Sequence, residues 1–132
     1  MWTVVPYDPS NFLALPSGQW TVRPQDQITW EYRVIDTDTL LMNWVIGNTN
    51  VSGNPIFLAM RLPAGFVAVS RIEPLHYYEE STFGKKVGWF DVNPNDGAGG
   101  TLIRHLKLDD SPWLNTTAHD CSVHGSVVIR LS

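Results

Sequence analysis

The sequence predicts an all-β protein, an antiparallel β-sandwich of jelly-roll or other Greek-key type with at most a short helical turn. Apolar and polar residues alternate with a period of two in several short segments. Turn-forming Gly, Pro, Asn and Asp residues separate these segments at intervals of roughly eight to twelve residues. In addition, no window of the length of a helix repeats apolar residues at spacings of three and four.

The clearest predicted strand is "QITWEYRVI", residues 27–35. Period-two alternation places four apolar side chains on one face of this strand, namely Ile28, Trp30, Tyr32 and Val34. The polar cluster "DTDT" follows and predicts a turn, because Asp side chains bond readily to nearby backbone amides. The next segment, "LLMNWVIG", is apolar on both faces, and we therefore expect a hairpin whose second strand is central in the sheet.

Residues 47–55, "GNTNVSGNP", have the composition of a loop. The strand pattern resumes in "IFLAMRL" and, after the turn at Pro63-Ala64-Gly65, in "FVAVSRI", residues 66–72. The run "LHYYEESTF" is rich in β-forming residues but alternates poorly.

In the remainder of the chain the strand predictions are "KKVGWFDV", "TLIRHLKL" and "SVVIRL", the first two separated by the Gly-rich loop "NPNDGAGG". Ser111-Pro112-Trp113-Leu114 is the best candidate for a helical turn, since Ser could cap it and Pro suits a first helical position. We expect one domain over residues 1–132, with residues 6–18 as an arm or extended loop.

Composition and charge exclude several classes of protein. The net charge of −4 offers no basic stripe that would neutralise phosphates, so we expect no nucleic-acid partner. Cys121 is the only cysteine, which rules out an intrachain disulfide framework and predicts a buried thiol. Neither a signal-peptide pattern nor a long apolar run is present, and we therefore expect a protein made in the cytoplasm without membrane insertion.

The segment "HDCSVH" is the densest group of potential metal ligands, with His119, Cys121 and His124 close in sequence. A metal site there is a weak hypothesis, because no second cluster supplies the remaining ligands. Strand alternation places His124, Ser126 and Arg130 on the outer face and His119 in the preceding loop. Surface histidines are the favoured interpretation, and we predict neither a metal nor another cofactor.

The aromatic residues divide into two groups. Trp30, Tyr32 and Trp44 fit strand positions and are most simply interpreted as core residues. The other rings lie beside loops or irregular segments, where they could stack on sugars or anchor a protein contact. These candidate ligand-binding residues are Tyr77, Tyr78, Trp89 and Trp113.

No catalytic motif supports an enzyme. The sequence contains no Gly-x-Ser-x-Gly elbow, no phosphate-binding Gly-rich loop before a helix and no His-Glu-x-x-His pair. We therefore predict a protein that acts by binding, without catalytic residues.

The segment "ITWEYRVIDTDTLLMNWVIGNTNVSGNPIFLAMRLPAGFVAVSR", residues 28–71, resembles a module of phage tail fibres and other virion surface proteins. The similarity rests on apolar spacing and on the Leu-Pro-x-Gly turn. It implies a β-sandwich that assembles side by side, often as a trimer, on the surface of a particle put together in the host cytoplasm. The segment "HDCSVH" has no counterpart in that pattern.

Three functional hypotheses follow. The leading one is a non-enzymatic phage structural protein, either a receptor-binding tail-fibre tip or a capsid decoration subunit, that contacts copies of itself, other virion proteins or a host glycan. The second is a carbohydrate-binding module that uses Trp89, Trp113 and Tyr77 as stacking platforms. The third is a small metal-dependent barrel enzyme based on the histidines, which are His76, His105, His119 and His124.

Overall fold

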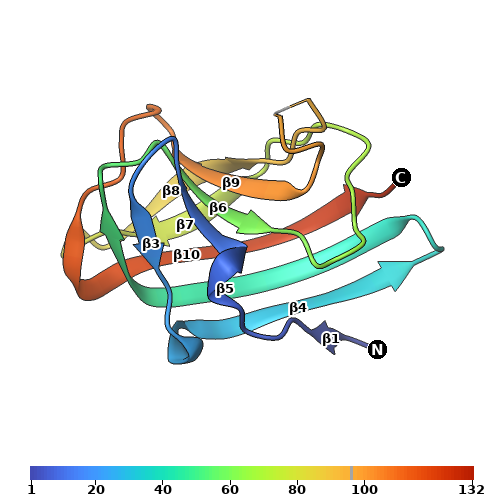
Figure 1. Ribbon diagram of the computed structural model, residues 1–132, viewed down its shortest axis with the longest axis horizontal. Helices are drawn as coiled ribbons and strands as arrows, with labels where there is room; N and C mark the ends of the chain where they lie inside the picture. Colours follow the sequence, from blue (N-terminus) through green and yellow to red (C-terminus); the bar gives the residue numbers. More distant parts are fainter. Residues whose placement is uncertain (96) are drawn as a thin grey trace.

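The computed structural model describes residues 1–95 and 97–132 and confirms the nearly all-β fold class (Figure 1). Within these residues, ten strands form one curled antiparallel sheet in the order β1-β4-β5-β10-β7-β8-β9-β6-β2, and β3 pairs with β5. Helical structure is confined in the described residues to two 3-10 turns, η1 (Pro9–Asn11) and η2 (Pro24–Asp26). In the Gly-rich loop "NPNDGAGG", Asp96 lies outside the described residues.

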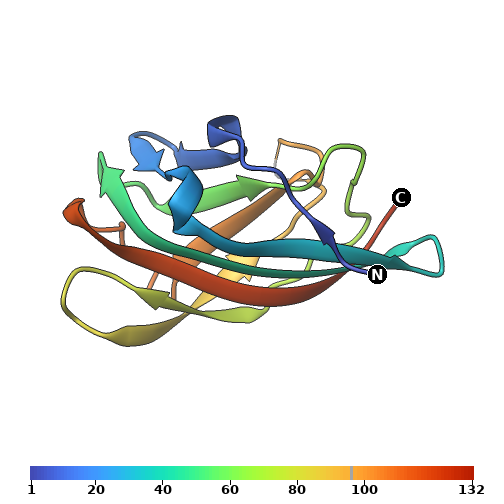
Figure 2. The same ribbon diagram turned by 90° about the horizontal axis from the view of Figure 1, so that it is seen from below.

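The sheet curls so that its two halves face each other like the layers of a sandwich (Figures 1 and 2). One half is built on the long strands β5 (Thr39–Ser52) and β10 (Thr116–Arg130), which run side by side. The other strands, in chain order, are β1 (Thr3–Val4), β2 (Phe12–Leu15), β3 (Gln19–Thr21), β4 (Gln27–Ile35), β6 (Phe57–Arg61), β7 (Leu75–Glu79), β8 (Lys85–Asp91) and β9 (Leu102–Lys107). β2 is the last strand at one edge of the sheet, and the next strand in the chain, β3, pairs with β5 near the other edge. The chain therefore crosses between the two halves at this point, and the sheet is nearly closed on itself.

The core fills the space between the two halves with large apolar side chains. Trp30 and Trp44 are buried, as expected from their strand positions, and Tyr32 is partly buried against the core. Phe12 of β2 packs edge-on against Trp20 of β3 with ring centroids 5.3 Å apart, and Trp44 meets Phe90 of β8 at 5.2 Å. Aromatic contacts of this kind join strands that are distant in sequence.

Several strands differ in extent from the prediction. Residues 47–52 belong to β5, although the composition of residues 47–55 indicates a loop. Thr49 is buried there, with its hydroxyl accepting from Trp20 Nε1 and donating to the Cys121 carbonyl, both at 2.8 Å. The predicted arm, residues 6–18, contributes η1 and β2, and β2 pairs with β6.

Two element predictions are wrong. "FVAVSRI" makes only the isolated bridges Ala68↔Leu131 and Ile72↔Val92 instead of a strand. The segment Ser111–Leu114 is not helical, because its backbone amides have tertiary partners: Trp113 N–H donates to the Pro55 carbonyl at 2.8 Å and Leu114 N–H to Glu80 Oε2 at 2.7 Å.

Candidate functional site

The candidate site lies on the outer face, which we define as the surface of β4, β5, β10, β7 and β8 that is turned away from the core. The strand registers align one residue from each of these strands across it. This row consists of Thr29, Val45, His124, Tyr77 and Val87. Since side chains alternate along a strand, the inner neighbours of these residues, including Trp44, Val123 and Tyr78, enter the core.

Several apolar side chains are exposed on the outer face. The exposed fraction is 66% for Leu75, 60% for Tyr77 and 59% for Val128. Ile28 also lies on the outer face and is 58% exposed. The prediction that it shares the inner face with Trp30 is therefore wrong. A β-bulge between Gln27 and Thr29 reverses its direction and lays its side chain over Gly47. Leu75, Tyr77 and Val87 adjoin one another on β7 and β8, and an exposed apolar cluster of this kind is typical of a binding surface in a folded protein.

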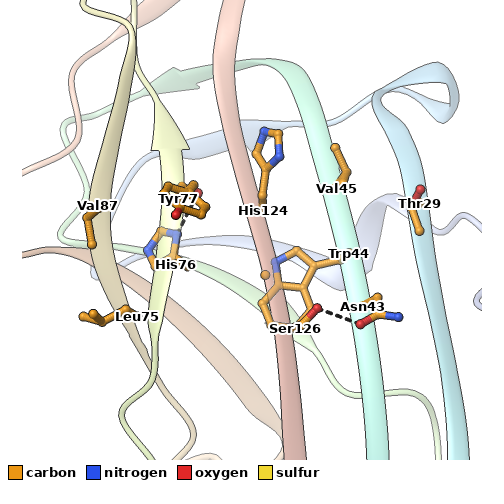
Figure 3. Close-up of a pocket in the computed structure, with 11 residues that line it drawn as sticks. Thr29, Asn43, Trp44, Val45, Leu75, His76, Tyr77, Val87, His124 and Ser126 are labelled. Atoms are coloured by element: carbon orange, nitrogen blue, oxygen red, sulfur yellow. Dashed lines mark hydrogen bonds between the residues drawn. The ribbon is translucent and has the colours of Figure 1, made fainter.

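A groove opens in the outer face because β7 and β10 diverge (Figure 3). These strands pair only from Ser122 to His124 of β10, against Tyr77 to Glu79 of β7. Beyond His124 they separate and leave a groove of ≈ 540 Å³ between them. That volume lies in the range of roughly 300–1,000 Å³ that is usual for small-ligand sites.

The two walls of the groove differ in chemistry (Figure 3). Leu75, Tyr77 and Val87 of the β7–β8 hairpin form an apolar wall. The opposite wall combines Val45 with neutral polar side chains from three strands, namely Thr29, Asn43, His124 and Ser126. Ser126 Oγ donates to Asn43 Oδ1 at 2.7 Å, which fixes the orientation of the amide and directs its N–H groups elsewhere.

Trp44 lies at the floor of the groove beneath Gly125. Its indole N–H donates to Nε2 of His105 at 3.0 Å, and His105 Nδ1–H donates to the Leu58 carbonyl at 2.7 Å. Both His105 nitrogens are therefore satisfied by one neutral tautomer. A Cβ atom at Gly125 would lie 2.2 Å from Trp44 Cζ2, so only glycine allows the indole to pass under β10.

His76 also lines the floor and contacts His105, with ring centroids 4.9 Å apart. Its Nδ1 lies 3.0 Å from the Tyr77 carbonyl oxygen and its Nε2 lies 3.3 Å from that of Leu106. Burial lowers the pKa of His76, and the hydrogen bonds to the carbonyls oppose that effect only in part. A neutral ring has one N–H and can donate to only one of these two carbonyls.

His124 stands at the middle of the outer face between Tyr77 and Val45 (Figure 3). Desolvation lowers its pKa, the nearby Lys85 lowers it further, and Glu79 acts in the opposite direction. We therefore treat His124, like His76, as uncharged at neutral pH. Among the described residues, none of the eleven that line the groove is an Asp, Glu, Lys or Arg.

The structure divides the four aromatic residues that the sequence singled out as ligand-binding. Tyr77 lines the groove, and Trp89 is half-buried on the outer face across from Leu75. The prediction that Tyr78 and Trp113 bind a ligand is corrected, because both side chains are buried. Their rings pack against each other with centroids 4.9 Å apart. Trp113 is fully buried and donates its indole N–H to the His105 carbonyl at 3.2 Å, so it cannot stack on a sugar.

The three weak metal-ligand candidates do not converge. Cys121 is buried, as predicted, and desolvation raises the pKa of its thiol to about 12. His124 lies on the outer face, as alternation predicts, whereas His119 lies within β10 instead of a loop, exposed and with a φ of 56°. Among residues 1–95 and 97–132, no three His, Cys, Asp or Glu side chains are grouped so that they could hold a metal ion.

Sequence reasoning missed most of the groove. Asn43, Val45, Leu75 and Ser126 carry no local signal of a site, because each looks like an ordinary strand residue. Alternation does show that these side chains point away from the core. Nothing local indicates that β7 and β10 separate at this point, and the separation is what creates the groove.

Comparison with known proteins gave no relative. No family model matches the chain. Neither the curated proteins nor the solved structures contain a match. In the described part of the chain, no helix has the length and apolar character to cross a membrane.

Proposed function

We propose that the protein is a non-enzymatic structural protein of a phage virion, a tail-fibre tip or capsid decoration subunit, that acts through contacts made by its outer face. The observation behind this proposal is the exposure of Ile28, Leu75, Tyr77 and Val128 on one sheet surface. Water contact of so much apolar surface is unfavourable, and a partner that covers it gains roughly 25 cal/mol for each Å² of apolar area removed from water.

The resemblance of residues 28–71 to virion surface modules supports the same proposal. This segment forms β4, β5 and β6, and the first two of these are two of the five strands of the outer face. At the sheet edge, β1 covers only part of β4: its paired residues are Thr3↔Tyr32 and Val4↔Glu31, and Val5 N–H donates to the Trp30 carbonyl at 2.9 Å. A partly covered edge strand beside an exposed apolar surface favours side-by-side association. We propose a homo-oligomer, with a trimer as the favoured state.

Light scattering during size-exclusion chromatography tests this proposal. The wild-type protein should have the mass of an oligomer, and Val128→Asp should shift it to the monomer because the carboxylate would be buried without a partner. Leu108→Asp is the matched control, because Leu108 is 61% exposed in the turn after β9 and lies outside the outer face. A monomeric wild type, or a Val128→Asp variant that still assembles, would count against the proposal.

A further inference from the structure

We propose that the groove between β7 and β10 binds a neutral saccharide. This inference rests on the proposed function: it names the ligand class that Leu75 and Tyr77 of the outer face would contact on a host surface, and it leaves Val128, which lies outside the groove, for the contact between copies. It goes further by assigning the site to a specific groove, by giving roles to Asn43 and Ser126, and by giving His124 a role other than the metal ligation considered from the sequence.

The absence of charge in the groove selects a neutral ligand. The described lining contains no Asp, Glu, Lys or Arg, and desolvation favours the uncharged forms of His76 and His124. An anionic or cationic ligand would lose hydration on entry without gaining a charged partner among the lining residues. An acidic sugar is therefore disfavoured, as is a charged peptide side chain.

The two unlike walls select an amphipathic ligand. A pyranose ring has C–H groups on its faces and hydroxyl groups around its rim. The C–H face matches the apolar wall of Leu75, Tyr77 and Val87, where the Tyr77 ring is largely exposed. The hydroxyl rim would then face the neutral polar side chains of the opposite wall. An aromatic side chain from a protein partner would satisfy the first wall but leave the second unpaired.

The polar wall provides both donors and acceptors. Asn43 Oδ1 accepts from Ser126 Oγ, so the Asn43 amide N–H groups remain to donate to a ligand oxygen. Neutral His124 has one donor and one acceptor, and the Thr29 hydroxyl can act in either role. Sugar hydroxyls also donate and accept, and they can therefore pair with this set without any ionised group.

The floor of the groove is held in place before a ligand arrives. Trp44 is only 1% exposed, and its indole is fixed by the bond to His105, which is itself bonded to the Leu58 carbonyl. A site whose lining is already ordered loses less conformational entropy on binding.

Titration calorimetry and amide NMR spectra with neutral oligosaccharides test the proposal. The probes are cellotetraose, maltotetraose, xylotetraose and chitotetraose, and sialyllactose and a heparin tetrasaccharide serve as the charged arms. We expect at least one neutral probe to bind and to shift the amide signals of Gly125 and Ser126. Tyr77→Ala and Asn43→Ala should each weaken binding at least about tenfold, the loss of one good contact.

Phe83→Ala is the matched control for Tyr77→Ala, because Phe83 is an exposed ring at the tip of the same hairpin and lies outside the groove. It should bind the probe as the wild type does. Retained far-UV circular dichroism shows that each variant is folded. The saccharide site is overturned if no neutral probe binds, if the charged probes bind more tightly, or if binding survives both groove substitutions.

Failure of this inference can be told apart from failure of the proposed function. If Val128→Asp becomes monomeric while neither that variant nor the wild type binds a saccharide, the proposed structural role is supported and the saccharide site is ruled out. If the wild type is monomeric and binds a saccharide, the saccharide site is supported and the proposed assembly is ruled out.

Discussion

At the scale of single residues, two buried polar side chains, His105 and Thr49, form hydrogen bonds across the core. His105 links Trp44 of β5 to Leu58 of β6, and Thr49 links Trp20 of β3 to the Cys121 carbonyl in β10. A buried polar group without such a partner would cost about 1–3 kcal/mol. These pairs explain how indole, imidazole and hydroxyl groups lie within a mostly apolar interior.

The close approach of Trp44 to Gly125 leads to a prediction about stability. Gly125→Ala places a methyl group 2.2 Å from the indole, which is fixed from its other side by His105. We expect the free energy of unfolding to fall by about 1–3 kcal/mol in urea titrations, the usual cost of overpacking.

Gly47→Ala is the matched control for that substitution. Gly47 is also a strand glycine, but its added methyl group would meet the end of the flexible Ile28 side chain at 2.8 Å on the outer face. Ile28 can move into solvent, so we expect a change below about 1 kcal/mol. Equal losses in the two variants would contradict the account of the Trp44 floor.

Some residue environments could be predicted from the sequence and others could not. Trp30, Trp44 and Cys121 are buried as their strand or composition indicates. Trp113 is buried although its neighbours have turn-like composition, because Pro55 and Glu80 bind the backbone on either side of it. Partners so distant in sequence leave no local signal.

At the scale of elements, alternation located the strands better than it located their ends. The hairpin of β4 and β5 follows from the pattern of residues 27–46 and the "DTDT" turn. The second half of β5 could not be predicted in this way, because its Gly and Asn residues are typical of loops. Tertiary contacts accommodate them in the strand: Asn50 Oδ1, for example, accepts from the His119 N–H at 2.8 Å. Composition therefore underestimates the length of a strand that is stabilised by neighbouring strands on both sides.

The end of β7 is joined to the end of β9 by a buried ion pair. Lys107 Nζ donates to Glu80 Oε1 at 2.6 Å, and Glu80 Oε2 accepts from the Leu114 N–H. The side chains of Lys107 and Glu80 are 9% and 6% exposed. Glu80 therefore ties both β9 and the segment that carries Trp113 to the end of β7.

Glu80→Ala should strongly destabilise the protein, because it leaves the Lys107 ammonium buried without its partner. We expect a loss of about 3–5 kcal/mol in the free energy of unfolding, measured by urea titration. The double variant Glu80→Gln/Lys107→Met should recover much of that loss, since it removes both charges and keeps similar volumes. A double variant as unstable as Glu80→Ala would show that the charges are not the cause.

At the scale of the whole molecule, the fold class could be predicted and the candidate site could not. Period-two alternation is a local property, and it suffices to indicate an antiparallel sandwich. The groove takes its lining from β4, β5, β7, β8 and β10, which span nearly one hundred residues of sequence. Its existence depends on the point where β7 leaves β10, which is set by the curl of the complete sheet.

The stability of the whole fold should depend on pH through its buried histidines. Burial, and secondarily the proximity of His76, hold the pKa of His105 well below the ordinary value of 6.5, and burial also lowers the pKa of His76. Below pH 6.5 the unfolded chain binds protons that these folded residues do not bind. Stability is therefore greatest above that pH and falls as the pH decreases, by up to about 1.4 kcal/mol per pH unit for each such histidine.

His105→Gln tests this linkage in urea titrations at pH 7, 6 and 5. The variant should be less stable than the wild type at pH 7, because Gln replaces a ring that packs against Trp44, Phe90 and His76. Its stability should nevertheless fall less steeply between pH 6 and 5, because one proton-binding difference is gone. Asp8 and Asp109, whose pKa values are lowered by hydrogen bonds from neighbouring serines, titrate below this window. Parallel slopes for variant and wild type would mean that His105 takes up a proton in the folded protein, which the bond from Trp44 forbids.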